Sequence, residues 1–356
     1  MKKRYIVNGD GLTGGQGLGV HRFAAEILKR LDSMAFENDF EIWIVVPSNK
    51  EISIKFENIS VKKFGVQKSG MIGKNLWQQI VFPFFVKMSR GIGVDMTLAI
   101  PMFGCGFVAI YDCIVEKFPE NYPSKRGRLM RWFYTRRVKM IARGKSEILT
   151  VSETSKKDII DTYKIKSNRI HVIESGWEHM QDIAEEPKIL QKLDLKANEY
   201  FFSLGSKYRH KNYAWIVEAA KANPESCFVV TGASFGKNED VDDKGKLPSN
   251  IIFTGYLSDG EIKTLMKECR AFVQPSLYEG FGIPPLEAMS VGSKVLIANA
   301  SCLPEIYGTA AHYLDPYHGA CNIEELLSGE VSDAGEVMKR YTWQRAAERV
   351  YDLLKK

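Results

Sequence analysis

Short apolar runs recur along the chain, and each is followed by a loop rich in glycine or polar residues and then by a helix-like segment. The first run, at 5–7, precedes a Gly-rich loop and a segment at 20–31 whose apolar residues share one helical face. This alternation is typical of parallel sheets with crossover helices, so it predicts an α/β fold. The predicted strands are 5–7, 41–46, 108–110, 148–151, 170–173, 200–204, 227–231, 251–254, 271–273 and 295–298.

The length of 356 residues exceeds what one ordinary core serves, and it predicts two domains. A polar segment at 177–199 interrupts the alternation of strands and helices, and we interpret it as the connection between the domains. The predicted N-terminal domain is residues 1–180 and the predicted C-terminal domain is residues 181–342. A last helix is predicted at 343–356.

Composition is that of a globular protein, with 45% hydrophobic and 26% charged residues. Six scattered cysteines without a C-x-x-C pair predict neither a zinc site nor a disulfide framework, and they favour a reducing, cytoplasmic location. The first residues contain no signal-peptide apolar region. The longest apolar tract, 92–111, contains Asp95 and Pro101, so we interpret it as two short strands rather than a membrane span.

The stretch 275–292, PSLYEGFGIPPLEAMSVG, combines a glycine-broken loop with the start of a helix. Its loop carries Glu279, two prolines suit the first helical turn, and Gly292 can end the helix. Glu287 is therefore predicted to lie in the first turn, near free backbone N–H groups that could hold a phosphate. There it could accept hydrogen bonds from a ribose diol, or it could simply complement the helix dipole.

Two further loops follow predicted strands. The loop 8–19, NGDGLTGGQGLG, contains a G-x-G-x-x-G match, but the helix does not begin at the third glycine and the strand 41–46 is followed by no acidic residue for a ribose. The loop 205–212, GSKYRHKN, brings cations to a helix start, which suits a diphosphate. A D-x-D match at 240–242 lies in a hydrophilic stretch and is interpreted as a solvated loop rather than a metal site.

Charge is unevenly distributed. Residues 121–146 hold nine Lys/Arg and no Asp/Glu in a chain whose net charge is +6. Apolar residues in this segment share a helical face, which predicts an ordinary packed helix with a basic side (Leu129, Trp132, Phe133, Met140 and Ile141). The basic residues at 125–145 fit an anionic membrane surface or a phosphate-bearing acceptor, and no nucleic-acid motif accompanies them. The apolar segment 75–88 is predicted to be mostly core.

The stretch 275–292 resembles the E-x7-E motif of retaining glycosyltransferases of family 4, which have the GT-B fold. The resemblance covers most of the chain, weakly at 30–95 and strongly at 200–316. It implies two doubly wound, Rossmann-like α/β domains that face each other across a cleft. The first would bind the acceptor, the second would bind the nucleotide sugar, and the helix 343–356 would pack back on the first.

The resemblance also implies roles for individual residues. Glu279 would orient the sugar hydroxyls and stabilise positive charge on the ring, and Glu287 would hold the ribose. Lys211 corresponds to the family lysine that neutralises the leaving diphosphate, and Arg209 substitutes for a family arginine. The residues expected to take part in catalysis are Glu279, Arg209, Lys211 and Asp112. The residues expected to bind the donor are Gly15, Gly17, Tyr111, Ser206, Gly280, Phe281, Gly282, Ile283 and Glu287.

The chain departs from the family pattern at three positions. Ser206 and His210 stand where the family has arginines, and Tyr111 stands where a mannosyltransferase-like subset has a histidine before Asp112. A tyrosine hydroxyl could still hydrogen-bond the donor sugar. Asp112 could contact a ligand or cap the local turn.

We therefore expect a retaining hexosyltransferase that needs no metal or other cofactor. It would move a hexosyl unit, with mannose from GDP-mannose as the first candidate, from a sugar nucleotide to a glycan or lipid-linked acceptor. A peripheral position on the inner face of the membrane would fit this role, and no nucleic-acid partner is expected. The alternatives are a non-catalytic sugar-nucleotide-binding subunit, motivated by the departures above, and an NAD-dependent enzyme, motivated by the G-x-G-x-x-G match.

Overall fold

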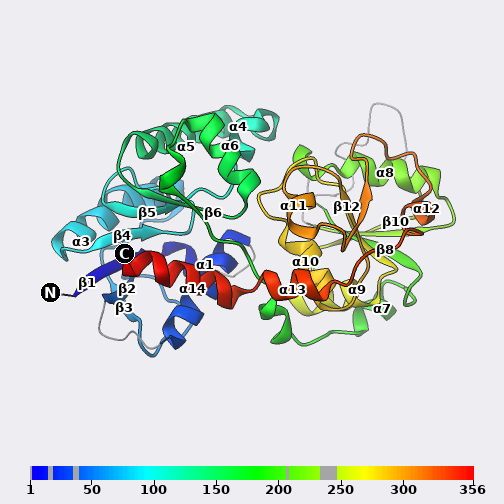
Figure 1. Ribbon diagram of the computed structural model, residues 1–356, viewed down its shortest axis with the longest axis horizontal. Coiled ribbons are helices and arrows are strands. Elements are labelled where there is room, and N and C mark those ends of the chain that lie inside the picture. Colours follow the sequence, from blue (N-terminus) through cyan, green and yellow to red (C-terminus); the bar gives the residue numbers. More distant parts are fainter. Residues whose placement is uncertain (1, 15–18, 35–39, 206–207, 233–246) are drawn as a thin grey trace. The chain divides into compact units, whose positions relative to one another are not determined.

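The computed structural model describes residues 2–14, 19–34, 40–205, 208–232 and 247–356. They form two compact units (Figure 1), one made of residues 1–175 together with 343–356 and the other of residues 176–342. The first boundary lies five residues before the position expected from the sequence, and the last helix, α14 (Trp343–Lys355), belongs to unit 1. No helix in the described ranges is both long and apolar enough to cross a bilayer.

Unit 1 is built on a parallel sheet. Its described part has seven strands in the order β3-β2-β1-β4-β5-β6-β7. The bounds of these strands are β1 Lys3–Asn8, β2 Phe40–Val46, β3 Ser60–Lys63, β4 Ile92–Asp95, β5 Cys105–Ala109, β6 Glu147–Thr150 and β7 Ile170–Val172. The tract 92–111 is thus two short strands, as predicted, whereas β3 was not predicted because its residues are largely exposed.

Helices cover the two faces of this sheet. Side chains of β1 alternate between the faces: Tyr5 donates its hydroxyl to the Leu354 carbonyl of α14 at 2.6 Å, and Ile6 packs under α3. One apolar cluster on the second face includes Trp77 and residues of α3, and another includes residues of α5 and α6. Cys105 packs against both, so α3, α5 and α6 share that face. The helices are α1 Gly19–Ser33, α2 Gly70–Leu76, α3 Phe82–Met88, α4 Ile114–Lys117, α5 Lys125–Arg143 and α6 Glu153–Tyr163, with one-turn helices at Asp10–Leu12, Pro119–Asn121 and Ser167–Arg169.

Two predictions about unit 1 are wrong in part. The segment 75–88 is core on one face only, because every fourth side chain from Leu76 to Met88 is exposed. The helix α5 is not packed along its whole length. Its second half buries Val138 and Ile141, whereas Leu129, Trp132 and Phe133 are exposed. Helical spacing alone indicated a shared face but could not tell what, if anything, covers it.

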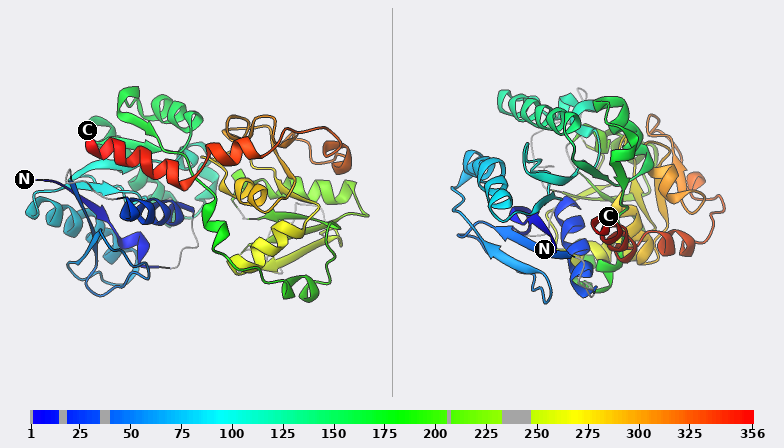
Figure 2. Two further views of the ribbon diagram at one scale, coloured as in Figure 1. Left: turned by 60° about the horizontal axis from the view of Figure 1, so that its bottom comes forward. Right: turned by 60° about the vertical axis from the view of Figure 1, so that its left-hand side comes forward.

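The end of the chain completes unit 1. The helix α14 lies against α1, as Figures 1 and 2 show, and Trp343 is fully buried with its ring edge-on to Phe23, 5.9 Å between centroids. Tyr351 packs on Phe40 at 5.4 Å. The strong amphipathic pattern of 343–356 therefore has its partner in the first helix of the chain.

Unit 2 repeats the architecture. The described sheet has six parallel strands in the order β10-β9-β8-β11-β12-β13. The strands are β8 Tyr200–Leu204, β9 Cys227–Thr231, β10 Ile251–Gly255, β11 Ala271–Gln274, β12 Val295–Ala298 and β13 His312–Leu314. The helices are α7 Lys188–Lys192, α8 Tyr213–Ala222, α9 Asp259–Glu268, α10 Ile283–Ser290, α11 Leu303–Tyr307, α12 Ile323–Leu326 and α13 Gly335–Arg340, with one-turn helices η5 Glu178–Gln181 and η6 Arg209–Lys211.

The strand order of unit 2 reverses direction between β8 and β11. In open parallel sheets, the loops that leave the carboxyl ends of two such strands diverge to opposite faces and leave a natural ligand position between them. Here those loops are 205–212 and 275–282, which are the two loops singled out from the sequence.

Candidate functional site

The loops after β8 and β11 are tied together by hydrogen bonds from a main-chain N–H and from the side-chain amide of Asn212 to main-chain carbonyls. The Leu277 N–H donates to the His210 carbonyl at 2.8 Å. The Asn212 amide donates to the carbonyls of Pro275 at 2.9 Å and Pro316 at 2.7 Å, which adds the loop after β13. Asn212 adopts a left-handed conformation with φ of +56°, which asparagine tolerates better than most residues. These contacts therefore fix the positions of residues 210–212 relative to residues 275–277.

Lys211 and Glu279 meet at this point. The Lys211 Nζ lies 2.7 Å from Glu279 Oε1, and the Gln274 amide donates to the same oxygen at 3.0 Å. Glu279 is 7% exposed, and burial works to raise the pKa of its carboxyl group. The charge and hydrogen bond of Lys211 outweigh this effect and hold the pKa of Glu279 below its ordinary value. The structure thus brings into contact two residues that lie 68 positions apart in the chain. The side chain of Glu279 is a carboxylate in this pair.

A third loop fixes the backbone of Glu279. The Ser301 hydroxyl donates to the Glu279 carbonyl at 2.8 Å, and the Glu279 N–H approaches the same hydroxyl oxygen at 3.3 Å. The Cys302 thiol also lies 3.3 Å from that carbonyl. Ser301 follows β12, so side chains or backbone from three strand ends meet around Glu279.

Glu287 does not lie where it was predicted. The helix α10 begins at Ile283, with Gly282 at its N-cap, so Glu287 is in the second turn and its own N–H is inside the helix. The reason is that the two prolines occupy the second and third helical positions rather than the first. Glu287 is 5% exposed, and its Oε1 lies 2.9 Å from His179 Nε2. His179 comes from η5, in the segment that we had interpreted only as a connection.

Residues 280–283 were predicted to bind the donor, and they also determine how the loop packs and where α10 begins. Gly282 has φ of +85°, and a Cβ there would come within 2.6 Å of Leu303. Phe281 is buried edge-on against Tyr341, with ring centroids 5.4 Å apart. The Tyr307 hydroxyl donates to the Gly282 carbonyl at the start of α10. Of the predicted donor-binding residues here, Gly280 is buried and Ile283 is half-buried at the start of α10, whereas the Phe281 side chain belongs to the core.

His210 and Arg209 lie beside this pair in η6. His210 is 5% exposed, and burial lowers its pKa to about 4, with Lys211 acting in the same direction. The imidazole is therefore neutral at pH 7 and replaces a family arginine without supplying its charge. Ser206, the other departure, lies outside the described residues, and so do Gly15, Gly17 and the D-x-D at 240–242.

The candidates in unit 1 have local partners. The Tyr111 hydroxyl donates to the Met96 carbonyl at 2.6 Å in the core, so its proton is not presented to a ligand. An oxygen of Asp112 accepts from the Ile114 N–H at 2.9 Å, which is the turn-capping alternative left open by the sequence. Tyr111 therefore does not stand in for the family histidine through a hydroxyl donated to the sugar.

One buried charge in the glycine-rich loop of unit 1 was missed. Asp10 has a fully buried side chain that accepts from Gln67 and Gln78, both at 2.7 Å, and lies 3.0 Å from Lys50 Nζ. Gly9 beside it leaves no room for a Cβ, which would lie 2.6 Å from Ile44. The signal in the sequence was the charged residue between two glycines directly after an apolar strand. Asp10 therefore anchors its own loop to the segments that carry Lys50 and Gln67 and to the helical residue Gln78.

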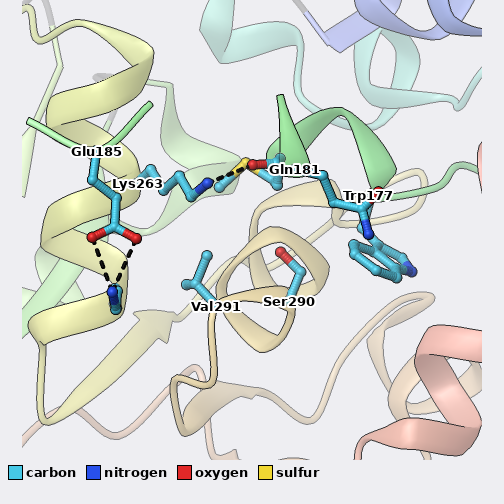
Figure 3. Close-up of a pocket in the computed structure, with 8 residues that line it drawn as sticks. Trp177, Gln181, Glu185, Lys263, Ser290 and Val291 are labelled. Carbon is cyan, nitrogen blue, oxygen red and sulfur yellow. Dashed lines mark hydrogen bonds and ion pairs between the residues drawn. The ribbon is translucent and has the colours of Figure 1, made fainter. Parts of the chain in front are cut away.

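Away from the Lys211–Glu279 pair, the described part of the chain shows no metal cluster and has a further pocket. In the described ranges, no three His, Cys, Asp or Glu side chains are grouped so as to hold a metal ion. Figure 3 shows a pocket at the far end of α10, lined by residues that include Trp177, Gln181, Glu185 and Ser290. Its lysines are engaged, since Lys263 Nζ donates to two main-chain carbonyls at 2.7 Å and Lys267 Nζ lies 2.9 Å from Glu185.

The chain has recognisable relatives. Residues 185–356 match the family described as glycosyl transferases group 1. The chain is 24% identical over 261 residues to the O-antigen chain mannosyltransferase RfbU of Salmonella typhimurium, over 70% of this chain and 69% of that protein. It is 30% identical over 221 residues to the O-antigen chain mannosyltransferase B of Escherichia coli, where the match spans 59% of this chain and only 55% of the relative.

Solved structures resemble the whole chain. The sucrose-phosphate synthase of Thermosynechococcus elongatus superposes with a TM-score of 0.71 at 13% identity, covering 99% of this chain and 98% of that one. Alr3699/HepE of Anabaena, solved in complex with UDP and glucose, gives a TM-score of 0.66 at 17% identity over 100% of both chains. At sequence identities this low, the structural similarity shows a shared fold and no more.

Proposed function

The chain is a glycosyltransferase of the GT-B fold with a glycosyl transferases group 1 domain at residues 185–356, and on this premise we propose its reaction. It transfers a hexosyl unit, first of all mannose, from a sugar nucleotide to a glycan or lipid-linked glycan, with retention at the anomeric carbon. The mannosyl assignment is supported by the names of the two relatives, both O-antigen chain mannosyltransferases. The observation that carries the proposal is the Lys211–Glu279 pair between the loops after β8 and β11.

In the proposed reaction the bond between the anomeric carbon and the diphosphate breaks, and the acceptor oxygen bonds to the same face of that carbon. The acceptor proton passes to the departing phosphate oxygen. Lys211 and Arg209 balance the charge that develops on the diphosphate, so no metal is required. Glu279, kept anionic by Lys211, accepts hydrogen bonds from the sugar hydroxyls and stabilises positive charge on the ring. Glu287, oriented by His179, holds the ribose.

A non-catalytic sugar-nucleotide-binding subunit is the second candidate. It is favoured by the engagement of the Tyr111 hydroxyl in the core and by the neutral His210 in place of a family arginine. The NAD-dependent alternative keeps only the G-x-G-x-x-G match, and tight NADH binding in a fluorescence titration would revive it. We place the reaction in the cytoplasm, which is supported by six free cysteines.

A donor panel tests the proposal. Thermal shifts with GDP-, UDP- and dTDP-sugars should identify the donor, and the anomeric configuration of the product, followed by NMR, should match that of the donor. Activity should survive EDTA. Lys211→Ala should weaken binding of donor and nucleoside diphosphate alike. Loss of activity in EDTA with recovery on adding Mn²⁺ or Mg²⁺ would overturn the metal-free reaction, and donor binding without transfer or hydrolysis would favour the non-catalytic subunit.

A further inference from the structure

A row of large apolar side chains lies exposed along the helical segment from α2 to α3 in unit 1. Its members recur at every fourth position: Ile72 at 82% exposure, Leu76 at 49%, Ile80 at 59%, Phe84 at 59% and Met88 at 55%. We call these five residues the apolar row. The opposite face of the same segment is buried, with Trp77, Phe82, Phe85 and Val86 in the core. A single exposed apolar residue is ordinary, but a regular row of five indicates an interaction surface.

A wide helical turn helps keep the row on one side. In an ordinary α-helix four residues turn by about 400°, so a strict spacing of four drifts by about 40° at each step. Between α2 and α3 the residues Trp77–Val81 form a π-helical turn, in which Phe82 N–H donates to the Trp77 carbonyl. The wider i→i+5 turn counteracts the drift. Pro83, which has no N–H for an α-helical bond to Gln79, lies just after it.

The exposed part of α5 adjoins this segment. Leu129, Met130, Trp132 and Phe133 are each about half exposed. Phe133 lies four residues before Arg137, hence on the same helical face, and Arg137 donates to the Asn75 side chain beside Leu76. Both helices belong to the layer on one face of the sheet (Figures 1 and 2), so the two apolar groups border one surface.

The positive charge of this surface indicates which kind of partner it binds. Residues 64–94, which hold the row, carry four Lys/Arg and residues 121–146 carry nine, and neither segment contains Asp or Glu. Because the whole chain is +6, the remaining residues total −7. Cations around exposed aromatic and aliphatic side chains match an anionic lipid surface, which attracts the charges and admits the apolar residues below its headgroups. A second copy on the same face would bring cations together, which disfavours self-association.

We propose that the apolar row and the exposed residues of α5 form one docking surface for an anionic lipid bilayer. The apolar residues enter the interface, and Lys and Arg of both segments contact the headgroups. This inference concerns a surface of unit 1 and does not depend on the identity of the donor or acceptor. It replaces the simpler expectation of attachment through the charges of 125–145 alone.

Sedimentation with vesicles tests it. The full chain should pellet with vesicles that contain phosphatidylglycerol at low salt, leave them at about 0.5 M salt, and ignore pure phosphatidylcholine vesicles. Each basic residue at the surface contributes about a fivefold gain in binding, so the triple variant Arg126→Ser, Arg136→Ser, Lys139→Ser should bind far more weakly. These three side chains are exposed.

A second variant isolates the apolar row at unchanged charge. Ile72→Ser, Ile80→Ser and Phe84→Ser together should weaken binding to anionic vesicles at least about tenfold. The matched control is Tyr256→Ser with Tyr317→Ser, two side chains of unit 2 that are 84% and 77% exposed and should not matter. Trp132, 53% exposed, should be quenched by brominated phosphatidylglycerol, and this quenching should vanish in Trp132→Phe.

Three results would overturn the docking surface. The wild-type chain could ignore anionic vesicles at low salt, the row variant could pellet like wild type, or sedimentation equilibrium could reveal a dimer that the row variant dissociates, which would assign the row to a second copy. Donor binding is measured on the same samples and should be equal in all variants. Vesicle binding without any sugar-nucleotide binding would reject the proposed reaction and leave the docking surface standing.

Discussion

At the scale of single residues, the centre of the site is a carboxylate that is kept ionised although it is buried. Among the described residues, Glu279 is paired with the cation of Lys211 and accepts from the Gln274 amide on the same oxygen. Such a group is preorganised, because its charge and position exist before a substrate arrives. Removing either member of the pair should be destabilising, because the charge of the other would then be buried without a partner.

Replacing this charge should affect turnover more than binding. Glu279→Gln keeps the shape and the main-chain contacts with Ser301 but removes the negative charge, so turnover should fall about 100-fold or more. Binding of the nucleoside diphosphate, measured by calorimetry, should barely change. Glu199→Gln, at a carboxylate whose side chain is 64% exposed, is the control. Wild-type turnover in Glu279→Gln would remove the proposed role.

His210 makes stability depend on pH. Its pKa is lowered to about 4 by burial, so between about pH 6.5 and pH 4 the unfolded chain binds a proton that the folded chain does not. Stability should therefore fall as the pH is lowered through that range, by up to about 3 kcal/mol from this group. His210→Gln, which cannot protonate there, should lose less. Urea unfolding at pH 7, 5.5 and 4.5 measures the difference, and equal losses in both proteins would contradict it.

At the scale of elements, α10 illustrates how one glycine sets the position of a helix. Gly282 supplies the left-handed conformation at the N-cap, and the helix then starts at Ile283. This start places Glu287 in the second turn, where His179 can reach it. A different N-cap would rotate Glu287 away from that partner.

Two glycines at the ends of this helix make a matched pair. Gly292→Ala meets no atom within 4 Å but has φ of +87°, so it should cost about 1 kcal/mol of stability from the backbone alone. Gly282→Ala has a similar φ of +85° and would also press on Leu303. It should cost clearly more and reduce donor binding, whereas Gly292→Ala should bind normally. Denaturant titrations and calorimetry would test this, and equal losses would show that the contact with Leu303 is relieved at no cost.

At the scale of the whole molecule, unit 1 is closed by the last residues of the chain. Trp343 is fully buried against Phe23, and Tyr5 bonds to Leu354. Trp343→Ala should lower the stability of unit 1 by about 3–5 kcal/mol, since it removes a large core side chain. Hydrogen exchange should accelerate in β1 and α1 and stay unchanged in β8 and β11. Uniform acceleration in both units would mean that they unfold as one.

The sequence by itself determined the fold class and several strands of unit 2. Apolar runs bounded by glycine and polar residues predicted β8 and β9 with the bounds that the structure has, because strand signals there are local. It also pointed to Lys211 and Glu279 as candidate site residues, through the resemblance to the E-x7-E motif and through a loop that brings cations to a helix start. It could not show that the two are in contact, because 68 residues separate them.

Only the tertiary structure decided which faces are covered. Helical spacing marked apolar faces on 75–88 and on α5 without telling a core from an exposed surface, since both have the same period. It also decided the partners of buried polar groups: His179 for Glu287, Met96 for Tyr111, and two glutamines with a lysine for Asp10. A local pattern fixes the element that a residue belongs to. What that residue contacts depends on strand order and packing, which bring together positions that are distant in the chain.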